Sequence, residues 1–396
     1  MEQRVEEGRL LMGPGPSDVS PRVLRAMSRP LVGHLDPEFL KIMNEIQDLL
    51  RSVFQTGNSF TLPLSGTGSS GMEASVANFV EEGDSVLVGA NGVFGQRIAE
   101  MVRRNGGVCT VVSAPWGEPL SEKSMLEAAE KCQPGIIAVV HAETSTGVLQ
   151  PLEPIREICD RLEALFLVDA VTSLGGHPVD VDSRKIDICY SGTQKCLSCP
   201  PGLAPVTFSP RAEAKLKNRT TPCKSWYLDL NLIGSYWGED RVYHHTAPIS
   251  MNYALREALK MIVEEGLEQR FNRHRHNHQA LVAGVEALGM KMHVDPNYRL
   301  WSLNTVRIPD GVDDAQVRSQ LLSQFNLEIG GGLGELQGKV WRVGLMGESS
   351  RAQNVLYFLL ALEICLRTQG FQCSQGAGVQ AAAARYTSSY PETESM

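Results

Sequence analysis

Short apolar segments alternate with longer segments of helical periodicity between residues 22 and 270, and few folds accommodate this alternation. Each apolar segment is bounded by glycine, proline or aspartate, which is typical of a strand buried on both faces. Strands and helices in alternation favour a mostly parallel sheet covered by helices on both sides, so we predict an α/β fold. The predicted strands are Ser85–Val88, Val108–Val112, Ile136–Val140, Ala164–Val168 and Ile186–Tyr190, and the predicted helices between them are Gly71–Val80, Phe94–Arg104, Ser121–Cys132 and Leu152–Arg161.

The pattern changes after a long helical stretch that runs from about residue 253 to residue 289. Two strand-like segments (302–308 and 341–344) and two helical segments (314–325 and 352–367) follow, and together they predict a compact α+β unit. From about Ser374 the residues are small and polar; the pattern over 379–386 permits a short helix, but we expect a mobile tail. We therefore divide the chain into an N-terminal arm (1–21), a large domain (22–270), a small C-terminal domain (271–373) and a tail (374–396).

Charge and hydropathy exclude several classes of protein. The chain has 37 Lys and Arg against 45 Asp and Glu, a net charge of −8, and a nucleic-acid partner would call for a basic excess. Its apolar runs are far shorter than the ~20 residues that span a bilayer, so no membrane is expected as a partner. The polar N-terminus does not resemble a signal peptide, which favours a cytoplasmic location.

Cysteine and histidine usage gives no indication of a metal site. Nine cysteines, an odd number spread along the chain, indicate a reducing compartment. Cys196 and Cys199 form a C-x-x-C pair without the second pair that a structural zinc site requires. His274, His276 and His278 alternate, so only two of them share a helical face, and we interpret them as surface residues.

Polar or glycine-rich residues directly follow four strand-like segments, at the edge where open α/β sheets bind ligands. Ser65–Gly71 precedes a helix and suits an anion, and His141–Gly147 offers hydroxyls. Asp169 ends one apolar strand. Lys195 follows a second apolar strand and has apolar neighbours in the sequence. Each segment alone has an ordinary explanation: a turn, a helix cap, a loop ion pair or a surface lysine. Together, a phosphate cradle, a buried carboxylate and a shielded lysine are what pyridoxal phosphate requires.

The sequence resembles the class V, fold type I aminotransferases, which depend on pyridoxal phosphate, and within them the alanine–glyoxylate and serine–glyoxylate group. The resemblance covers about residues 11 to 367 and implies a large, mostly parallel-sheet domain with a smaller C-terminal α+β domain. The motifs that carry it are MGPGPSDVSPRVLRAM (12–27), VGHLDPEF (32–39), FQTGN (54–58), NGVFGQR (91–97), ETSTGVLQPL (143–152), LVDAVTSLGG (167–176), SGTQKCL (191–197), YHHTAP (243–248) and KVWRVGLMG (339–347).

The resemblance also implies a role for each matching residue. Lys195 and Asp169 are the catalytic pair, as the Schiff-base lysine and the partner of the pyridine nitrogen. Many members carry tryptophan where this chain has Phe94, which keeps the stacking on the cofactor but loses an N–H. The cofactor-binding residues are Thr67, Gly68, Ser69, Phe94, Thr144, Asp169, Gln194, Lys195, Tyr243 and Thr246, the last two donated by the neighbouring subunit of a homodimer.

Three further residues are assigned to the substrate by the resemblance. Arg342 pairs with the α-carboxylate, because its planar fork matches a carboxylate bidentately. Gly15 and Ser173 line the substrate side. No second arginine stands out for a distal carboxylate, which favours a small amino acid.

The expected reaction is a ping-pong Schiff-base transamination from a small amino acid, alanine first and serine next, to glyoxylate, giving glycine and a 2-keto acid. Some segments also resemble bacterial (S)-ureidoglycine–glyoxylate aminotransferases of purine catabolism, although that branch favours amide side chains where this chain has His34 and Tyr243. A class V desulfurase or lyase is a remoter alternative, since it would need a mobile nucleophilic cysteine and usually a histidine in place of Phe94.

Overall fold

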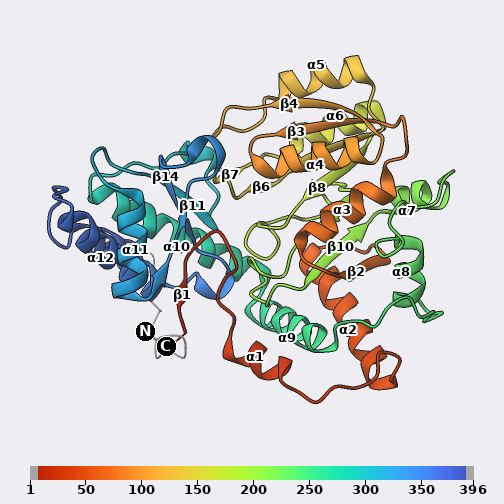
Figure 1. Ribbon diagram of the computed structural model, residues 1–396, viewed down its shortest axis with the longest axis horizontal. Helices are drawn as coiled ribbons and strands as arrows, with labels where there is room; N and C mark the ends of the chain where they lie inside the picture. The colour runs from red at the N-terminus through yellow and green to blue at the C-terminus, as the bar shows by residue number, and fades with distance from the viewer. Residues whose placement is uncertain (1–7, 389–396) are drawn as a thin grey trace, which may run out of the picture.

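The computed structural model describes residues 8–388, which form a large part and a small part (Figure 1). The strands are β1 (Leu10–Leu11), β2 (Phe60–Ser65), β3 (Ser85–Ala90), β4 (Val108–Ser113), β5 (Ile136–Val140), β6 (Ala142–Glu143), β7 (Val148–Leu149), β8 (Leu165–Asp169), β9 (Ile188–Tyr190), β10 (Leu203–Phe208), β11 (Leu303–Arg307), β12 (Leu327–Glu328), β13 (Gly330–Gly331) and β14 (Val340–Gly344). The helices are α1 (Pro21–Met27), α2 (Pro37–Phe54), α3 (Gly68–Phe79), α4 (Val93–Arg104), α5 (Glu122–Cys132), α6 (Glu153–Leu162), α7 (Pro210–Lys217), α8 (Leu230–Trp237), α9 (Ile249–Glu265), α10 (Leu267–Ala287), α11 (Asp314–Phe325), α12 (Ala352–Thr368) and α13 (Ala377–Ser388).

A seven-stranded sheet of order β2-β10-β9-β8-β5-β3-β4 forms the centre of the large part, which confirms the predicted α/β fold. Strands β9, β8, β5, β3 and β4 are parallel to one another, and β10 is antiparallel to both β9 and β2. Strands β2 and β10 were not predicted from the sequence. Each contains a proline, Pro63 opposite Pro205 in the register, and a proline inside an apolar run argues against a central strand.

Two large apolar clusters and one small cluster form the core. The first contains residues between Val23 and Ile262 and lies on both faces of the large sheet. The second joins Met12 to residues 280–382 around the small sheet β11-β14-β13. Between the clusters the long helical stretch divides into α9 and α10 at Gly266, whose φ of +82° suits glycine. A third, smaller cluster of Ala142, Cys196, Leu300, Leu303 and Met346 joins the two parts, and the domain boundary near residue 270 stays a prediction.

The N-terminal segment crosses from the small part to the large part. Strand β1 pairs in parallel with β12, with Leu10 opposite Leu327. The Met12 carbonyl then accepts a hydrogen bond from the Gly344 N–H on β14 (2.7 Å). Two residues later the Pro14 carbonyl accepts a hydrogen bond from Lys195, so one short segment contacts both parts.

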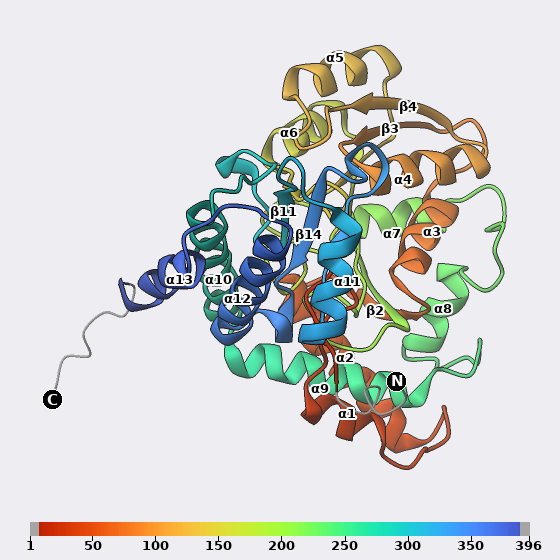
Figure 2. The same cartoon turned by 60° about the vertical axis from the view of Figure 1, so that its left-hand side comes forward.

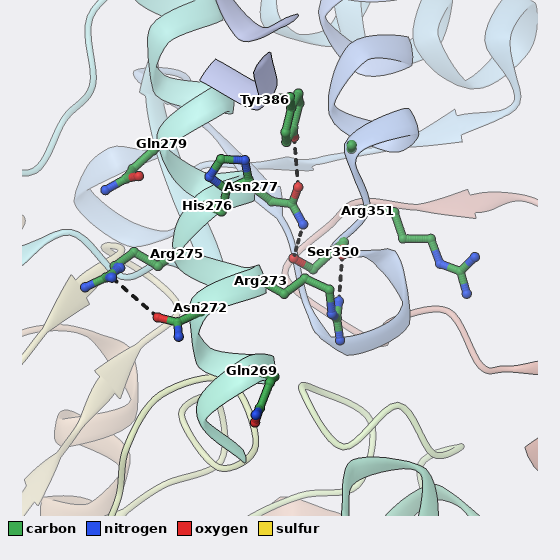
Figure 3. A pocket seen from close by; sticks show the side chains of 11 residues that line it. Gln269, Asn272, Arg273, Arg275, His276, Asn277, Gln279, Ser350, Arg351 and Tyr386 are labelled. Carbon is green, nitrogen blue, oxygen red and sulfur yellow. Dashed lines mark hydrogen bonds between the residues drawn. The ribbon is translucent and has the colours of Figure 1, made fainter. Parts of the chain in front are cut away.

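Instead of a mobile tail, residues 377–388 form α13, which packs against α10 and α12 (Figure 2). A Cβ on Gly284 of α10 would lie 2.8 Å from the Gly378 carbonyl of α13, so small residues let the two helices approach closely. The Tyr386 hydroxyl donates to Asn277 (2.8 Å), and Asn277 in turn donates to Ser350 (3.1 Å; Figure 3). The small residues that suggested a tail are thus the ones that permit packing; residues 389–396 lie outside the described part.

Two of the three alternating histidines are buried, so interpreting them as surface residues was wrong. His274 Nε2 accepts a hydrogen bond from the Gly347 N–H (2.9 Å), and His278 Nδ1 lies 2.6 Å from the Asn304 side-chain oxygen, where α10 faces the small part. Within residues 8–388, no cluster of histidine, cysteine and carboxylate side chains has a metal-binding arrangement. None of the described helices combines the length and apolar character needed to cross a bilayer.

Candidate active site

A cavity of about 210 Å³ lies at the carboxyl ends of the parallel strands. The turns after β2, β3, β5, β8 and β9 all contribute to it, as expected for the ligand-binding edge of an open α/β sheet. The residues that line it are Gly68, Ser69, Met72, Phe94, Arg97, Val140, Ala142, Thr144, Asp169, Val171, Thr172, Gln194 and Lys195. Seven of these were singled out from the sequence, so segments up to 127 positions apart in the chain meet as expected.

The turn between β2 and α3 brings the start of a helix into the cavity wall. Thr67 is the N-cap of α3, and Gly68 and Ser69 begin its first turn, where backbone N–H groups have no partner within the helix. A Cβ on Gly68 would lie 3.3 Å from Val171 and 3.5 Å from Gly192, so glycine lets this turn lie close to the opposite wall. The arrangement offers N–H groups, a hydroxyl and a positive helix end to a phosphate.

Asp169 ends β8 with only 3 % of its surface exposed. One carboxylate oxygen accepts a hydrogen bond from the Val171 N–H (2.9 Å) and the other from the Tyr190 hydroxyl (2.8 Å). Burial raises the pKa of this carboxyl to about 7, an effect that the two hydrogen bonds oppose. A buried carboxylate of this kind is stabilised by a cationic partner, which a protonated pyridine nitrogen would provide.

Lys195 reaches the cavity from the loop after β9. Its amine donates to the Pro14 carbonyl, and its side chain runs beside Gly15, where an added Cβ would lie 2.8 Å from the lysine Cδ. Burial, followed by the positive charge of Arg342, lowers the pKa of Lys195 to about 8. A larger fraction of the amine is therefore neutral at physiological pH than in an exposed lysine, as attack on an aldehyde requires.

Arg342 lies on β14 of the small part and reaches across to the large part. Its Nε donates to the Gly331 carbonyl (2.8 Å), and its Nη1 donates to the carbonyl of Thr144, a cavity-lining residue (3.2 Å). Burial lowers the pKa of Arg342. These contacts hold the guanidinium beside the cavity, where it can meet a carboxylate.

The other predicted residues have different surroundings. Ser173 is buried, and its hydroxyl has no hydrogen-bond partner among the described residues. Thr67 comes directly before Gly68, which lines the cavity, but does not line it itself. Tyr243 and Thr246 are exposed and do not line the cavity. The segment of these last two is tied to the end of β2 by His245, whose ring nitrogen lies 2.6 Å from the Ser65 hydroxyl.

Two long side chains in the cavity wall, Met72 and Arg97, were not predicted from the sequence. Met72 and Arg97 each lie one helical turn after a predicted residue, Ser69 on α3 and Phe94 on α4. The i, i+3 spacing was the signal that would have found them. The Arg97 guanidinium lies 5.0 Å from the centre of the Phe94 ring, so a second arginine does stand at the cavity.

The residues present fit pyridoxal phosphate. The start of α3 can hold the phosphate, Asp169 can pair with the pyridine nitrogen, Lys195 can join the aldehyde and the Phe94 ring can stack on the cofactor. The buried side-chain oxygen of Gln194, in the same wall, has no hydrogen-bond partner among the described residues and remains available to a bound group.

The chain belongs to the class V aminotransferases: residues 11–335 match this family. It is 42% identical over 392 residues to (S)-ureidoglycine–glyoxylate transaminase of Bacillus subtilis, covering 94% of each chain. It is 43% identical over 351 residues to alanine–glyoxylate aminotransferase of Rattus norvegicus, covering 87% of this chain and 84% of the relative. The crystal structure of an alanine–glyoxylate aminotransferase from Nostoc sp. superposes with a TM-score of 0.89 at 53% identity, covering 91% of this chain and 95% of that one.

These relatives confirm three predictions: the fold type I architecture, the aminotransferase activity and pyridoxal phosphate as the cofactor. The ureidoglycine–glyoxylate aminotransferase of Bacillus subtilis superposes with a TM-score of 0.94, covering 96% of this chain and 98% of that one. Because relatives of both substrate types are similar to the chain over most of its length, overall similarity does not distinguish the two donors.

Proposed function

We propose that this aminotransferase moves the amino group of a small amino acid, alanine first and serine next, to glyoxylate, giving glycine and a 2-keto acid. The observation that carries the choice of donor is the pair formed by His34 and Tyr243, whose rings lie 5.0 Å apart. The ureidoglycine branch favours amide side chains at these positions, and two rings in contact provide fewer donors and acceptors for a ureido group.

Each proposed role follows from the side chain's position. Bound pyridoxal phosphate supplies an aldehyde that amines can join and a ring that draws electrons from the substrate Cα. Asp169 holds a proton at the ring nitrogen, and Arg342 binds the carboxylate that the amino acid and glyoxylate have in common. Lys195, with its lowered pKa, accepts the α-proton at Nζ and returns it. Donor and acceptor use one site in turn, which is a ping-pong order.

A donor screen tests this proposal. Single-turnover rates with alanine, serine, (S)-ureidoglycine and aspartate are followed through the cofactor's visible absorbance. Alanine should react fastest and serine next. A marked preference for (S)-ureidoglycine would refute the proposal and favour the alternative. Aspartate probes Arg97, because a fast reaction would mean that this arginine binds a distal carboxylate.

The desulfurase or lyase alternative finds little support in the cysteines. Cys365 lies on α12 and is fully buried, and burial raises the pKa of its thiol to about 11. A mobile nucleophile needs the opposite, an accessible thiol with a lowered pKa. Phe94 also stands where such enzymes usually carry histidine. Release of sulfide from cysteine would revive this alternative.

We also propose a homodimer in which Tyr243 and Thr246 complete the partner's site. Exposed apolar side chains next to them support this, since Trp226, Val242 and Tyr243 are each more than half exposed. A cytoplasmic location is part of the proposal and is supported by the nine free cysteines.

Hybrid dimers test the shared site. Lys195→Ala and Tyr243→Ala subunits, each inactive or weak alone, are refolded together. If the two residues meet across the interface, the mixture should recover about a quarter of the wild-type activity, because half of the dimers then contain one intact site. If both residues act within one subunit, or if the protein is a monomer, mixing restores nothing.

A further inference from the structure

The first turn of α4 is capped by side chains from a distant segment. Gly92 is its N-cap residue and has no side chain with which to accept a hydrogen bond. Instead, the Val93 N–H donates to the Ser145 hydroxyl (3.0 Å) and the Phe94 N–H donates to the Glu143 carboxylate (3.1 Å). Two of the N–H groups that every helix start leaves unpaired are therefore satisfied by the last residue of β6 and by the turn that follows it.

Glu143 is a buried carboxylate that the proposed reaction does not use. It is fully buried, and one of its oxygens accepts hydrogen bonds from both the N–H (3.0 Å) and the hydroxyl (2.6 Å) of Ser145. A Cβ on Gly92 would lie 2.5 Å from the Glu143 Cδ, so the start of α4 lies directly against this carboxylate. Burial raises the pKa of Glu143, and the hydrogen bonds from Ser145 and Phe94 oppose that rise.

The hydrogen bonds at the start of α4 affect two residues that line the cavity, Phe94 and Thr144. Phe94 is the second residue of α4, so the point at which this helix starts determines where its ring lies in the cavity wall. On the other side, Thr144 follows Glu143 directly, lines the cavity and accepts the hydrogen bond from Arg342. One buried carboxylate thus adjoins the ring that stacks on the cofactor and the backbone that holds the substrate arginine.

We propose that Glu143 is a positioning residue, whose carboxylate caps α4 and thereby fixes the Phe94 ring against the cofactor. A carboxylate suits this place because it only accepts hydrogen bonds, and donors from Phe94, Gly95 and Ser145 converge on it. An amide would turn an NH₂ group towards one of those donors and leave that donor unpaired. The proposal rests on the family's cofactor and not on the identity of the amino donor.

The test begins with Glu143→Gln in the cofactor-free protein. Hydrogen exchange at the Val93 and Phe94 amides should be faster by about fivefold or more, as the loss of a helix cap implies. Titration with pyridoxal phosphate should show weaker binding, and the circular dichroism that the bound cofactor acquires should decrease. No amino donor takes part in these measurements, so the proposal is judged separately from the choice of substrate.

Asp187→Asn is the matched control. Asp187 is another buried carboxylate, and it accepts hydrogen bonds from the Phe166 N–H (3.0 Å) and the Ser209 hydroxyl (2.6 Å), away from the cavity. Its loss should lower stability without changing exchange at residues 93 and 94 or the cofactor's dichroism. If this control alters those signals as much as Glu143→Gln does, the effect is a general loss of stability and the proposal is wrong.

A double-mutant cycle with Phe94→Ala decides whether Glu143 acts through the ring. Glu143→Gln should weaken cofactor binding in the wild-type background and have little further effect once Phe94 is alanine. An equal loss in both backgrounds, or wild-type exchange rates in Glu143→Gln, would overturn the proposal. If Glu143→Gln does not fold, Ser145→Ala removes the hydroxyl that caps Val93 instead. This variant should change hydrogen exchange, cofactor affinity and circular dichroism in the same directions by smaller amounts.

Discussion

Replacing Asp169 by asparagine should stabilise the cofactor-free protein while removing its activity. The carboxyl is 3 % exposed, and burial raises its pKa from the ordinary 3.8 to about 7. Because the folded state retains a proton that the unfolded chain releases, the free energy of unfolding falls as the pH rises from about 4 to about 7. At pH 8 the ionised carboxylate costs about 4 kcal/mol relative to the unfolded chain.

Asparagine removes this cost but gives up one acceptor. The Val171 N–H and the Tyr190 hydroxyl donate to different carboxylate oxygens, and an amide provides only one. Subtracting about 1–2 kcal/mol for the unpaired donor leaves Asp169→Asn about 2–3 kcal/mol more stable at pH 8. Near pH 5 the cost in the wild type is only about 1–2 kcal/mol, so the advantage should vanish.

Urea denaturation of both cofactor-free proteins at pH 5 and pH 8, at one protein concentration, measures the effect. Activity of the cofactor-loaded variant should fall by about two orders of magnitude or more, as when one preorganised electrostatic partner is removed. Lower stability of Asp169→Asn at pH 8, or a difference independent of pH, would contradict the assigned burial cost. A stabilised but inactive variant would mark Asp169 as a residue kept for function.

Three further outcomes are expected. The rate at which pyridoxal phosphate becomes covalently attached should rise about tenfold per pH unit and level off near pH 8, where Lys195 titrates, whereas Arg342→Gln should move the plateau to higher pH by removing a neighbouring positive charge. Arg342→Lys should raise KM for alanine and glyoxylate about 10–100-fold in steady-state kinetics, because lysine lacks the bidentate fork. Ending the chain at Gly376 should lower the melting temperature by about 1 °C for each kcal/mol of α13 packing that is lost, whereas Tyr386→Phe, which removes one hydrogen bond, should lower it less.

The features predictable from the sequence were those with a local signal. The strand Ile136–Val140 agrees with β5 at both ends, because a continuous apolar run between polar residues marks a buried strand. Asp169, Lys195 and the start of α3 adjoin one cavity, because the carboxyl ends of parallel strands meet at one edge. The individual roles of Phe94, Thr144 and Gln194, which also line the cavity, followed from the family resemblance.

The features that escaped prediction depend on contacts between distant segments. Pro63 and Pro205 argued against strands at the positions of β2 and β10. The pairing of β2 with β10, in which the two prolines lie opposite each other, is visible only in the folded sheet. In the sequence, the small residues of α13 resemble a linker. In the structure, they pack against α10. Glu143 gave no signal of its own, because its hydrogen-bond donor Phe94 is 49 positions away.

The N-terminal segment has a consequence for synthesis of the chain on the ribosome. Leu10 emerges early, yet its partner Leu327 is made 317 residues later, and the Gly344 N–H that binds the Met12 carbonyl is made later still. At about 5–20 residues per second, the segment waits roughly 15–60 s for the strand beside which it finally lies. The Pro14 carbonyl that contacts Lys195 belongs to this same segment. The active site is therefore completed only after β12 and β14 have been made, and a nascent chain that has already formed the large sheet still lacks the N-terminal side of its lysine site.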